Sequence, residues 1–177
     1  MRFPYRKLLV VGCGGAGKST FAREAGARFD IPVVHLDRLW WLRGWVERGA
    51  DEFDALLKRE LEKPAWVIDG NYLRTLALRA EYCDAIVFLD LPTEECLKSA
   101  YARAEEYRGR TRPDMTEGCP ETVHEDFERW ILGFNTDVRG DLLDALRASG
   151  KPYFPFETRA AAYAWLNGFE SADMTEK

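Results

Sequence analysis

Residues 7–20 of the chain read Lys7-Leu8-Leu9-Val10-Val11-Gly12-Cys13-Gly14-Gly15-Ala16-Gly17-Lys18-Ser19-Thr20. The apolar run at 7–11 is typical of a strand buried on both faces, because it does not alternate with polar residues. The spacing of the next apolar side chains predicts a helix over 17–29, with its buried face at Phe21, Ala22, Ala25 and Phe29. A buried strand therefore passes into a helix through a glycine-rich loop.

This loop fits the pattern G-x-x-x-x-G-K-[ST] at every fixed position, which defines the P-loop. Glycines allow positive φ and carry no Cβ, so successive backbone N–H groups can surround a phosphate beside the helix N-terminus. We expect Lys18 to reach the β- and γ-phosphates and the Ser19 hydroxyl to ligate Mg²⁺. The alternative is an accidental glycine-rich turn, which the position between a strand and a helix disfavours. The predicted nucleotide-binding residues are Gly12, Gly14, Gly15, Ala16, Gly17, Lys18, Ser19 and Thr20.

Strands and helices alternate along the rest of the chain. Apolar runs predict further strands at 33–36, 66–68, 85–89 and 153–156, the last at a sheet edge because it contains proline. Helical periodicity predicts helices at 51–61, 92–104, 127–134, 138–146 and 159–166. This order predicts a three-layer α/β fold with about five parallel strands and helices on both faces. We expect a single domain over 1–170, followed by a polar tail at 171–177.

Composition limits the classes of partner. The net charge is −5, whereas proteins that bind duplex DNA usually present a basic surface, so nucleic acid is unlikely as a partner, though not excluded. No stretch approaches the ~20 apolar residues of a membrane span, and the N-terminus does not read as a signal peptide, so we expect a cytoplasmic protein. The cysteines are far apart, which predicts free thiols and no zinc site: Cys13, Cys83, Cys96 and Cys119.

Several polar residues follow predicted strands and should share one rim of the sheet, where α/β proteins bind ligands. Three aspartates at strand ends, Asp37, Asp69 and Asp90, are candidates to hold Mg²⁺ through water, and Asp90 is the one expected to be structural. The resemblance described below selects Asp69. Asp37 is the leading general base if the acceptor is a hydroxyl; a phosphate acceptor would need no base. The predicted acceptor-binding residues are Asp37, Arg38 and Trp41, to which the resemblance described below adds Asn71 and Arg74.

An arginine-rich segment follows the helix at 92–104. Arg103 and Arg110 would share a face if that helix continued to Arg110, and planar guanidiniums suit the charge of a transferring phosphoryl group. We predict catalytic roles for Arg103, Arg110 and Arg112, together with Lys18. The resemblance described below implies that 107–120 forms a short lid. The alternative is a solvated, charged helix end.

Two longer segments resemble known proteins. The stretch Trp66-Val67-Ile68-Asp69-Gly70-Asn71-Tyr72-Leu73-Arg74-Thr75 resembles the adenylate-kinase segment in which an apolar strand ends in Asp-Gly-Phe-Pro-Arg-Thr. This resemblance implies that Asp69 orients Mg²⁺ and that Arg74, which falls one position late, grips an acceptor phosphate. Over nearly the whole chain, the motifs His35-Leu36-Asp37, Asp69-Gly70-Asn71-Tyr72 and 111–121 resemble the adenylate-kinase-related DNA topology modulation (FlaR-like) proteins.

Three functional hypotheses remain open from the sequence. The first is an ATP- and Mg²⁺-dependent phosphotransferase of the nucleotide-kinase type that acts on a small acceptor, for which a nucleoside monophosphate is one candidate. The second is a kinase for a metabolite that is not a nucleotide, which needs the same ATP-binding half. The third is a nucleotide-dependent regulator that affects DNA topology or binds a macromolecular partner and has little kinase activity. The base of the nucleotide is expected near 156–159.

Overall fold

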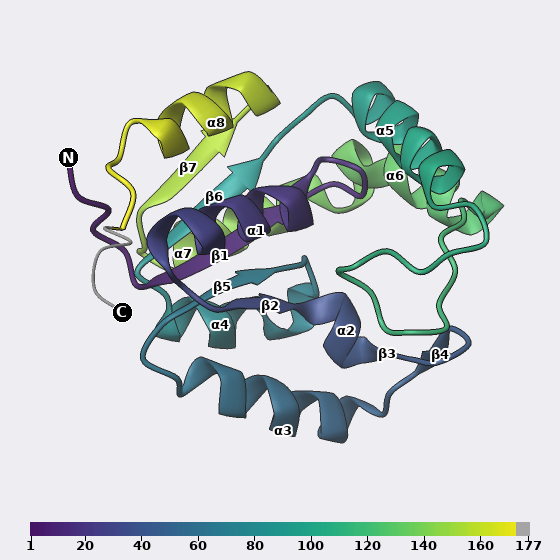
Figure 1. Ribbon diagram of the computed structural model, residues 1–177, viewed down its shortest axis with the longest axis horizontal. Coiled ribbons are helices and arrows are strands. Elements are labelled where there is room, and N and C mark those ends of the chain that lie inside the picture. The colour runs from purple at the N-terminus through teal and green to yellow at the C-terminus, as the bar shows by residue number, and fades with distance from the viewer. Residues whose placement is uncertain (173–177) are drawn as a thin grey trace.

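A parallel sheet of five strands forms the centre of the molecule, and all five are labelled in Figure 1. The computed structural model describes residues 1–172, so most of the predicted polar tail lies outside the described residues. Both the strand count and the parallel arrangement predicted from the sequence are confirmed. The strand order is β2 (Val33–His35), β5 (Trp66–Asp69), β1 (Lys7–Gly12), β6 (Ala85–Leu89) and β7 (Tyr153–Phe156).

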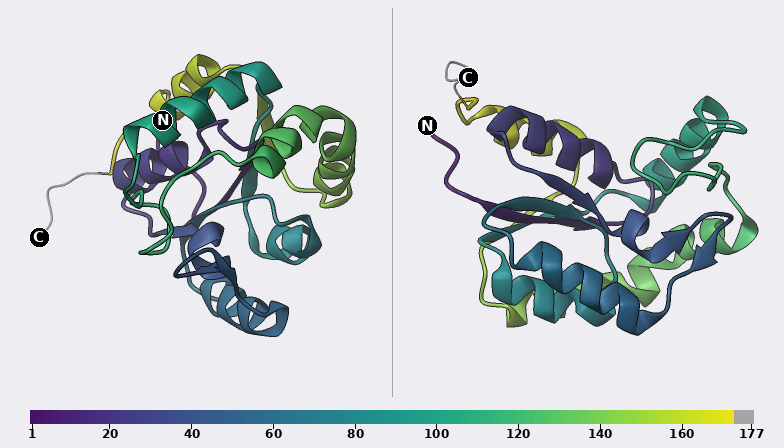
Figure 2. Two further views of the ribbon diagram at one scale, coloured as in Figure 1. Left: turned by 90° about the vertical axis from the view of Figure 1, so that its right-hand side faces the viewer. Right: turned by 60° about the horizontal axis from the view of Figure 1, so that its bottom comes forward.

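Helices cover both faces of this sheet, which confirms the predicted three-layer architecture. One face carries α1 (Lys18–Phe29) and α8 (Arg159–Asn167), and the other carries α3 (Ala50–Leu61), α4 (Leu76–Tyr82) and α7 (Arg139–Ala148) (Figure 2). Two further helices, α5 (Thr93–Glu106) and α6 (Glu125–Asp137), pack together beyond the carboxyl ends of the strands. No helix within residues 1–172 combines the length and apolar character needed to cross a membrane.

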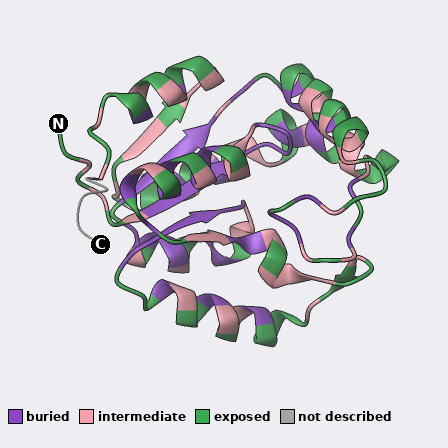
Figure 3. Ribbon diagram, viewed as in Figure 1, coloured by how far each residue is buried: buried purple, intermediate pink, exposed green. Residues whose placement is uncertain are grey.

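The core follows the central strands. In β1 the side chains of Leu8, Leu9, Val10 and Val11 are fully buried, and all of β6 is buried as well (Figure 3). β1 lies between β5 and β6 and is covered by helices on both faces, which explains why its sequence is a continuous apolar run. All four cysteines are buried and free, as the sequence predicts.

Short elements near the carboxyl edge were not predicted. The second strand ends at His35, because Leu36 begins the one-turn helix α2 (Leu36–Trp40). A small hairpin of β3 (Trp41–Leu42) and β4 (Val46–Glu47) follows, and a 3₁₀ turn η1 (Leu73–Thr75) precedes α4. Each of these elements is too short to give a periodic apolar pattern.

The end of α5 corrects one expectation about the arginines. The helix ends at Glu106, and the backbone N–H of Tyr107 closes its last turn. Arg110 therefore lies in the following loop and shares no helical face with Arg103. A glycine at position 109 with φ of +69° marks the point where the chain leaves the helical direction.

Candidate functional site

The glycine-rich loop joins β1 to α1 at the carboxyl edge of the sheet. α1 begins at Lys18, so Lys18 and Ser19 lie in its first turn. The Lys18 ammonium donates a hydrogen bond to the carbonyl oxygen of Cys13 at 2.9 Å. Burial lowers the pKa of Lys18, and the carboxylates of Asp37 and Asp69 oppose that shift. The loop thus places a cation beside a helix N-terminus, an arrangement that favours a bound phosphate.

Two glycines of this loop lie directly against neighbouring helices. At Gly15, φ is +80° and an added Cβ would come within 2.0 Å of the carbonyl oxygen of Cys96 in α5. At Gly14, an added Cβ would lie 2.8 Å from Cζ of Phe127 and 3.1 Å from Cζ3 of Trp130, both on α6. The loop shape is therefore fixed by packing from α5 and α6 as well as by its own backbone.

Asn71 holds the start of the loop. Its Oδ1 accepts a hydrogen bond from the N–H of Gly12 at 2.9 Å, and its Nδ2 donates to the Gly12 carbonyl oxygen at 2.7 Å. The two residues meet because β5 pairs with β1 in a register that sets Asp69 opposite Val10. Asn71 lines the cavity, as an acceptor-binding residue would, but its amide is engaged by the loop backbone. In this structure Asn71 positions the phosphate loop.

Two carboxylates stand beside the loop on neighbouring segments. Asp69 ends β5, is 3% exposed, and its Oδ2 lies 3.0 Å from Nδ1 of His35. Asp37 lies on α2, one step beyond the predicted strand end, and its Oδ1 accepts a hydrogen bond from the Tyr72 hydroxyl at 2.8 Å. Burial, followed by the charge of Asp37, raises the pKa of Tyr72, so this phenol stays protonated and donates. The Asp37 side chain is 39% exposed, so it is the carboxylate open to a ligand.

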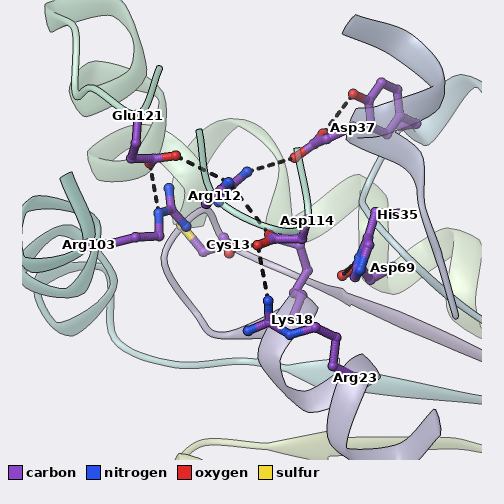
Figure 4. Close-up of polar contacts among 11 residues, drawn as sticks. Cys13, Lys18, Arg23, His35, Asp37, Asp69, Arg103, Arg112, Asp114 and Glu121 are labelled. Carbon is purple, nitrogen blue, oxygen red and sulfur yellow. Dashed lines mark hydrogen bonds and ion pairs between the residues drawn. The ribbon is translucent and has the colours of Figure 1, made fainter. Parts of the chain in front are cut away.

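A buried arginine, Arg112, gathers three carboxylates around one guanidinium (Figure 4). Its Nη2 lies 3.4 Å from Asp37 Oδ2, and its Nε lies 3.5 Å from Asp114 Oδ2 and 3.1 Å from Glu121 Oε2. Arg103 of α5 donates from Nε to Glu121 Oε1 at 2.7 Å. These pairs connect α2, α5 and the 107–120 segment in one polar cluster.

Asp114 extends this cluster to α1. Arg23 donates from Nη1 to Asp114 Oδ1 at 3.4 Å. Burial would raise the pKa of Asp114, but the charge of Arg112, a backbone N–H and the Ser19 hydroxyl together lower it. The Asp114 carboxylate is therefore ionised next to Ser19, the predicted Mg²⁺ ligand.

One cavity of about 1270 Å³ joins the phosphate loop to these carboxylates. The oxygen groups that line it include Ser19, Asp37, Asp69 and Asp114, and oxygen is the donor that Mg²⁺ prefers. Within residues 1–172, no three His, Cys, Asp or Glu side chains form a ready-made metal cluster. The donor set therefore fits Mg²⁺ held by one or two protein oxygens and otherwise by water and phosphate.

The structure brings only part of the predicted set to this cavity. Its lining includes the loop residues Gly14, Gly15, Gly17, Lys18, Ser19 and Thr20, and also Asp37, Trp41, Asp69, Asn71, Arg103 and Arg112. Arg74 lies outside the lining, because both of its terminal nitrogens donate to Asp54, at 2.8 and 2.7 Å. Arg110 is exposed and donates to the Glu106 carbonyl oxygen, and Arg38 also lies outside. The expected structural role of Asp90 agrees with its pairing to Arg139, at 2.7 Å for each of two hydrogen bonds.

Several residues of the site were not predicted in the role that the structure gives them. Arg79 of the unpredicted α4 is fully buried and donates to the carbonyl oxygens of Gly70, Asn71 and Tyr72. Arg159, at the start of α8, donates to the carbonyl oxygens of Gly15 at 2.8 Å and Ala16 at 3.2 Å. Asp114, Glu121 and Tyr72 fall within the segments that resemble known families, which was the one pointer to them.

Comparison with known proteins establishes the fold. No family model matches the sequence, and a search of curated proteins finds no match. Among solved structures, the chain is similar to shikimate kinase from Acinetobacter baumannii in complex with shikimate. That match has a TM-score of 0.60 and 20% identity, and it covers 93% of this chain and 90% of that chain.

Two further structures agree. Shikimate kinase from Bacteroides thetaiotaomicron matches with a TM-score of 0.57 and 16% identity, over 93% of this chain and 96% of that chain. The YorR protein from Bacillus subtilis, in complex with phosphorylated GDP, matches with a TM-score of 0.55 and 14% identity, over 91% and 92%. The resemblance to DNA topology modulation proteins stays a prediction. The chain has the α/β fold of the P-loop kinases.

Proposed function

We propose that the protein is a kinase that transfers the γ-phosphoryl group of Mg·ATP to a small acceptor bound near Asp37. The observation that carries this proposal is the single cavity that joins Lys18 and Ser19 of the phosphate loop to Asp37 and an aromatic wall. Structures of the same fold, solved with shikimate and with phosphorylated GDP, support small-molecule ligands. We also propose that the phosphoryl donor is ATP and not another nucleoside triphosphate.

The loop residues would bind the phosphate groups of the nucleotide. The backbone N–H groups of the loop after Gly12 and the Lys18 ammonium would bind the phosphate oxygens, and their charges oppose the negative charge of the transferring group. The N–H of Gly12 itself donates to Asn71. Ser19 would hold Mg²⁺ directly and Asp69 through water. The ion supplies charge neutralisation when bound. His35, at 3.0 Å from Asp69, fixes the orientation of that carboxylate.

Arg103 and Arg112 would stabilise the phosphoryl group during transfer. Both line the cavity and both are held in place by Glu121. We propose that the 107–120 segment acts as a short lid, since it carries Arg112 and Asp114 to the cavity from beyond α5. Closure of such a segment would exclude water from the reacting groups.

Asp37 is the proposed general base for a hydroxyl acceptor. The acceptor oxygen would form a bond to the γ-phosphorus while the bond from that phosphorus to the bridging oxygen breaks and ADP leaves. The hydroxyl proton would pass to the Asp37 carboxylate. Tyr72 donates to one oxygen of that carboxylate and so fixes its orientation.

The test is phosphoryl transfer from γ-labelled Mg·ATP to a panel of nucleosides, nucleotides, sugars and hydroxy acids. We expect label in one acceptor class, no transfer with Lys18→Ala, and a kcat about 10²–10⁴-fold lower with Asp37→Asn while ATP still binds. Asp126→Asn is the matched control, because Asp126 also lines the cavity but its side chain is 94% exposed.

A different result would favour the regulatory hypothesis. If the protein binds Mg·ATP but labels no acceptor, the kinase proposal fails. Salt-dependent retention of DNA by the same preparation would then support a nucleic-acid partner.

A further inference from the structure

The charges that line the cavity indicate what kind of acceptor it can hold. Within residues 1–172, the cationic side chains of the lining are Lys18 of the phosphate loop, Arg159, Arg23, Arg103 and Arg112. Arg159 is committed to the loop backbone, where it donates to two carbonyl oxygens. Three guanidiniums are left that could meet the charge of an acceptor.

Each of these three guanidiniums already faces a carboxylate. Arg23 lies 3.4 Å from Asp114, and Arg103 lies 2.7 Å from Glu121. Arg112 has three carboxylates within 3.5 Å. The acceptor end therefore offers no cation that is free of an acidic partner.

Carboxylates outnumber these guanidiniums in the lining. Asp37, Asp114 and Glu121 belong to the cluster, and four further acidic groups also line the cavity: Glu47, Asp69, Glu106 and Asp126. Arg103 and Arg112 are proposed to face the transferring phosphoryl group while they keep their carboxylate partners, so an acceptor phosphate or carboxylate would be a second anion at the same guanidiniums. To pair with it, a guanidinium would have to leave a buried carboxylate without its counterion. The anionic acceptor would also share the cavity with the remaining carboxylates, and placing like charges next to each other weakens binding.

The other groups at this end suit a neutral molecule. Trp41 and Trp45 lie edge to face with ring centroids 5.4 Å apart, and both line the cavity with Trp40 and Tyr72. Aromatic side chains of this kind bind the flat or apolar face of a ring. The partly exposed Asp37 can accept a hydrogen bond from a hydroxyl group of that ring.

From this arrangement we infer that the acceptor is an uncharged, ring-bearing hydroxyl compound, of the nucleoside or sugar class, and neither a nucleoside monophosphate nor a hydroxy acid. The inference rests on the proposed kinase function and names the substrate class of that site. It excludes the nucleotide acceptor that the resemblance to adenylate kinase suggests. Arg74, which that resemblance assigns to an acceptor phosphate, pairs instead with Asp54 outside the cavity.

Matched pairs of compounds test the inference. The pairs are adenosine with AMP, cytidine with CMP, glucose with glucose 6-phosphate, and shikimate methyl ester with shikimate. For each we would measure label transfer from Mg·ATP, and binding by quenching of tryptophan fluorescence in the presence of a non-hydrolysable ATP analogue. We expect the uncharged member of at least one pair to be preferred by about tenfold or more in both measurements. Comparison of the nucleoside pairs with the glucose pair shows whether the acceptor is a nucleoside or a sugar.

A charge variant sharpens the test. Glu121→Gln removes the carboxylate shared by Arg103 and Arg112 and should shift the preference toward the charged member by about tenfold, whatever its effect on stability. Glu117→Gln, four residues earlier in the chain and exposed, should leave the preference unchanged. The ratio within a pair is an internal control, because partial unfolding lowers both members equally.

The outcomes separate the two proposals. Transfer to AMP, CMP or shikimate in preference to the neutral partner overturns this inference and leaves the kinase function intact. Absence of transfer to every compound overturns the kinase function, and the fluorescence titration still decides which member of each pair the cavity prefers. If no neutral member binds at millimolar concentration, the inference is overturned as well.

Discussion

At the scale of single residues, Asn71 is the side chain whose loss should be easiest to interpret. It makes two hydrogen bonds to the Gly12 backbone, so Asn71→Ala leaves a partly buried N–H and a carbonyl oxygen without their partner. We expect the free energy of unfolding to fall by about 1–3 kcal/mol and the Kd for Mg·ATP to rise, because the loop loses its anchor. Urea denaturation and nucleotide titration measure the two effects. Asn135→Ala on the exposed side of α6 is the control; an unchanged Kd in Asn71→Ala would contradict the positioning role.

Asp114 gives the molecule a specific dependence on pH. Its pKa is lowered in the folded state, so its ionised form stabilises the fold above about pH 4, the region where a free aspartate has lost its proton. This contribution disappears as the pH falls through the folded-state pKa. Asp114→Asn should therefore be less stable than the natural protein at about pH 7, and the difference should shrink below about pH 4.

Denaturation by urea at several pH values measures this difference in the free energy of unfolding. Asp126→Asn serves as control, because Asp126 pairs with Arg129 on the exposed side of α6 and should change stability by at most about 0.5 kcal/mol. A difference between the natural protein and Asp114→Asn that is independent of pH would mean that Asp114 acts through packing and not through its charge.

At the scale of elements, the 107–120 segment is held to the body of the molecule by Arg112. Removing this guanidinium leaves Asp37, Asp114 and Glu121 close together without their shared counterion, and such losses typically cost about 3–5 kcal/mol when the site is buried. We expect Arg112→Ala to speed amide hydrogen exchange across 110–122 while exchange in β1 and β6 stays slow. Mass spectrometry of proteolytic fragments would locate the change. Arg108→Ala, at an exposed position, should behave like the natural protein; uniform acceleration throughout the chain would indicate global destabilisation instead.

The same scale shows what could be predicted from the sequence. The five strands and the long helices were predictable from local patterns. An apolar run such as 85–89 indicates a buried strand, and apolar residues at helical spacing, as in α5, indicate a helix with one buried face. The elements α2, β3, β4 and α4 were not predicted, because stretches of two to seven residues contain too few apolar positions to reveal helical or strand periodicity.

The residues of the site were predictable only where they lie close together in the sequence. The phosphate loop is a contiguous motif, and strand-end residues such as Asp69 follow from the direction of parallel strands. The pairs that join Arg112 to Asp37 and Arg23 to Asp114 span 75 and 91 residues, and only the folded chain brings them together. For Arg74, a familiar segment predicts an acceptor contact, whereas the side chain pairs with Asp54 in this structure.

At the scale of the whole molecule, the fold should be stabilised by the nucleotide proposed to bind it. A ligand that binds only the native state adds about 2.7 kcal/mol at one hundred times its Kd, so the melting temperature should rise with Mg·ATP concentration. Thermal denaturation with and without Mg·ATP checks this. Lys18→Ala should melt close to the natural protein without nucleotide and show a smaller rise with it. An equal rise in both proteins would place the nucleotide away from the phosphate loop.

The contacts of Gly14 and Gly15 also bear on how this chain can change over generations. The motif leaves both positions open to any residue, yet here Phe127, Trp130 and the Cys96 carbonyl fill the space that a side chain would need. Substitutions that other bearers of the motif accept should therefore distort the loop in this chain unless α5 or α6 has shifted first. The order in which mutations can be accepted is thus set by two helices distant in sequence from the motif they constrain.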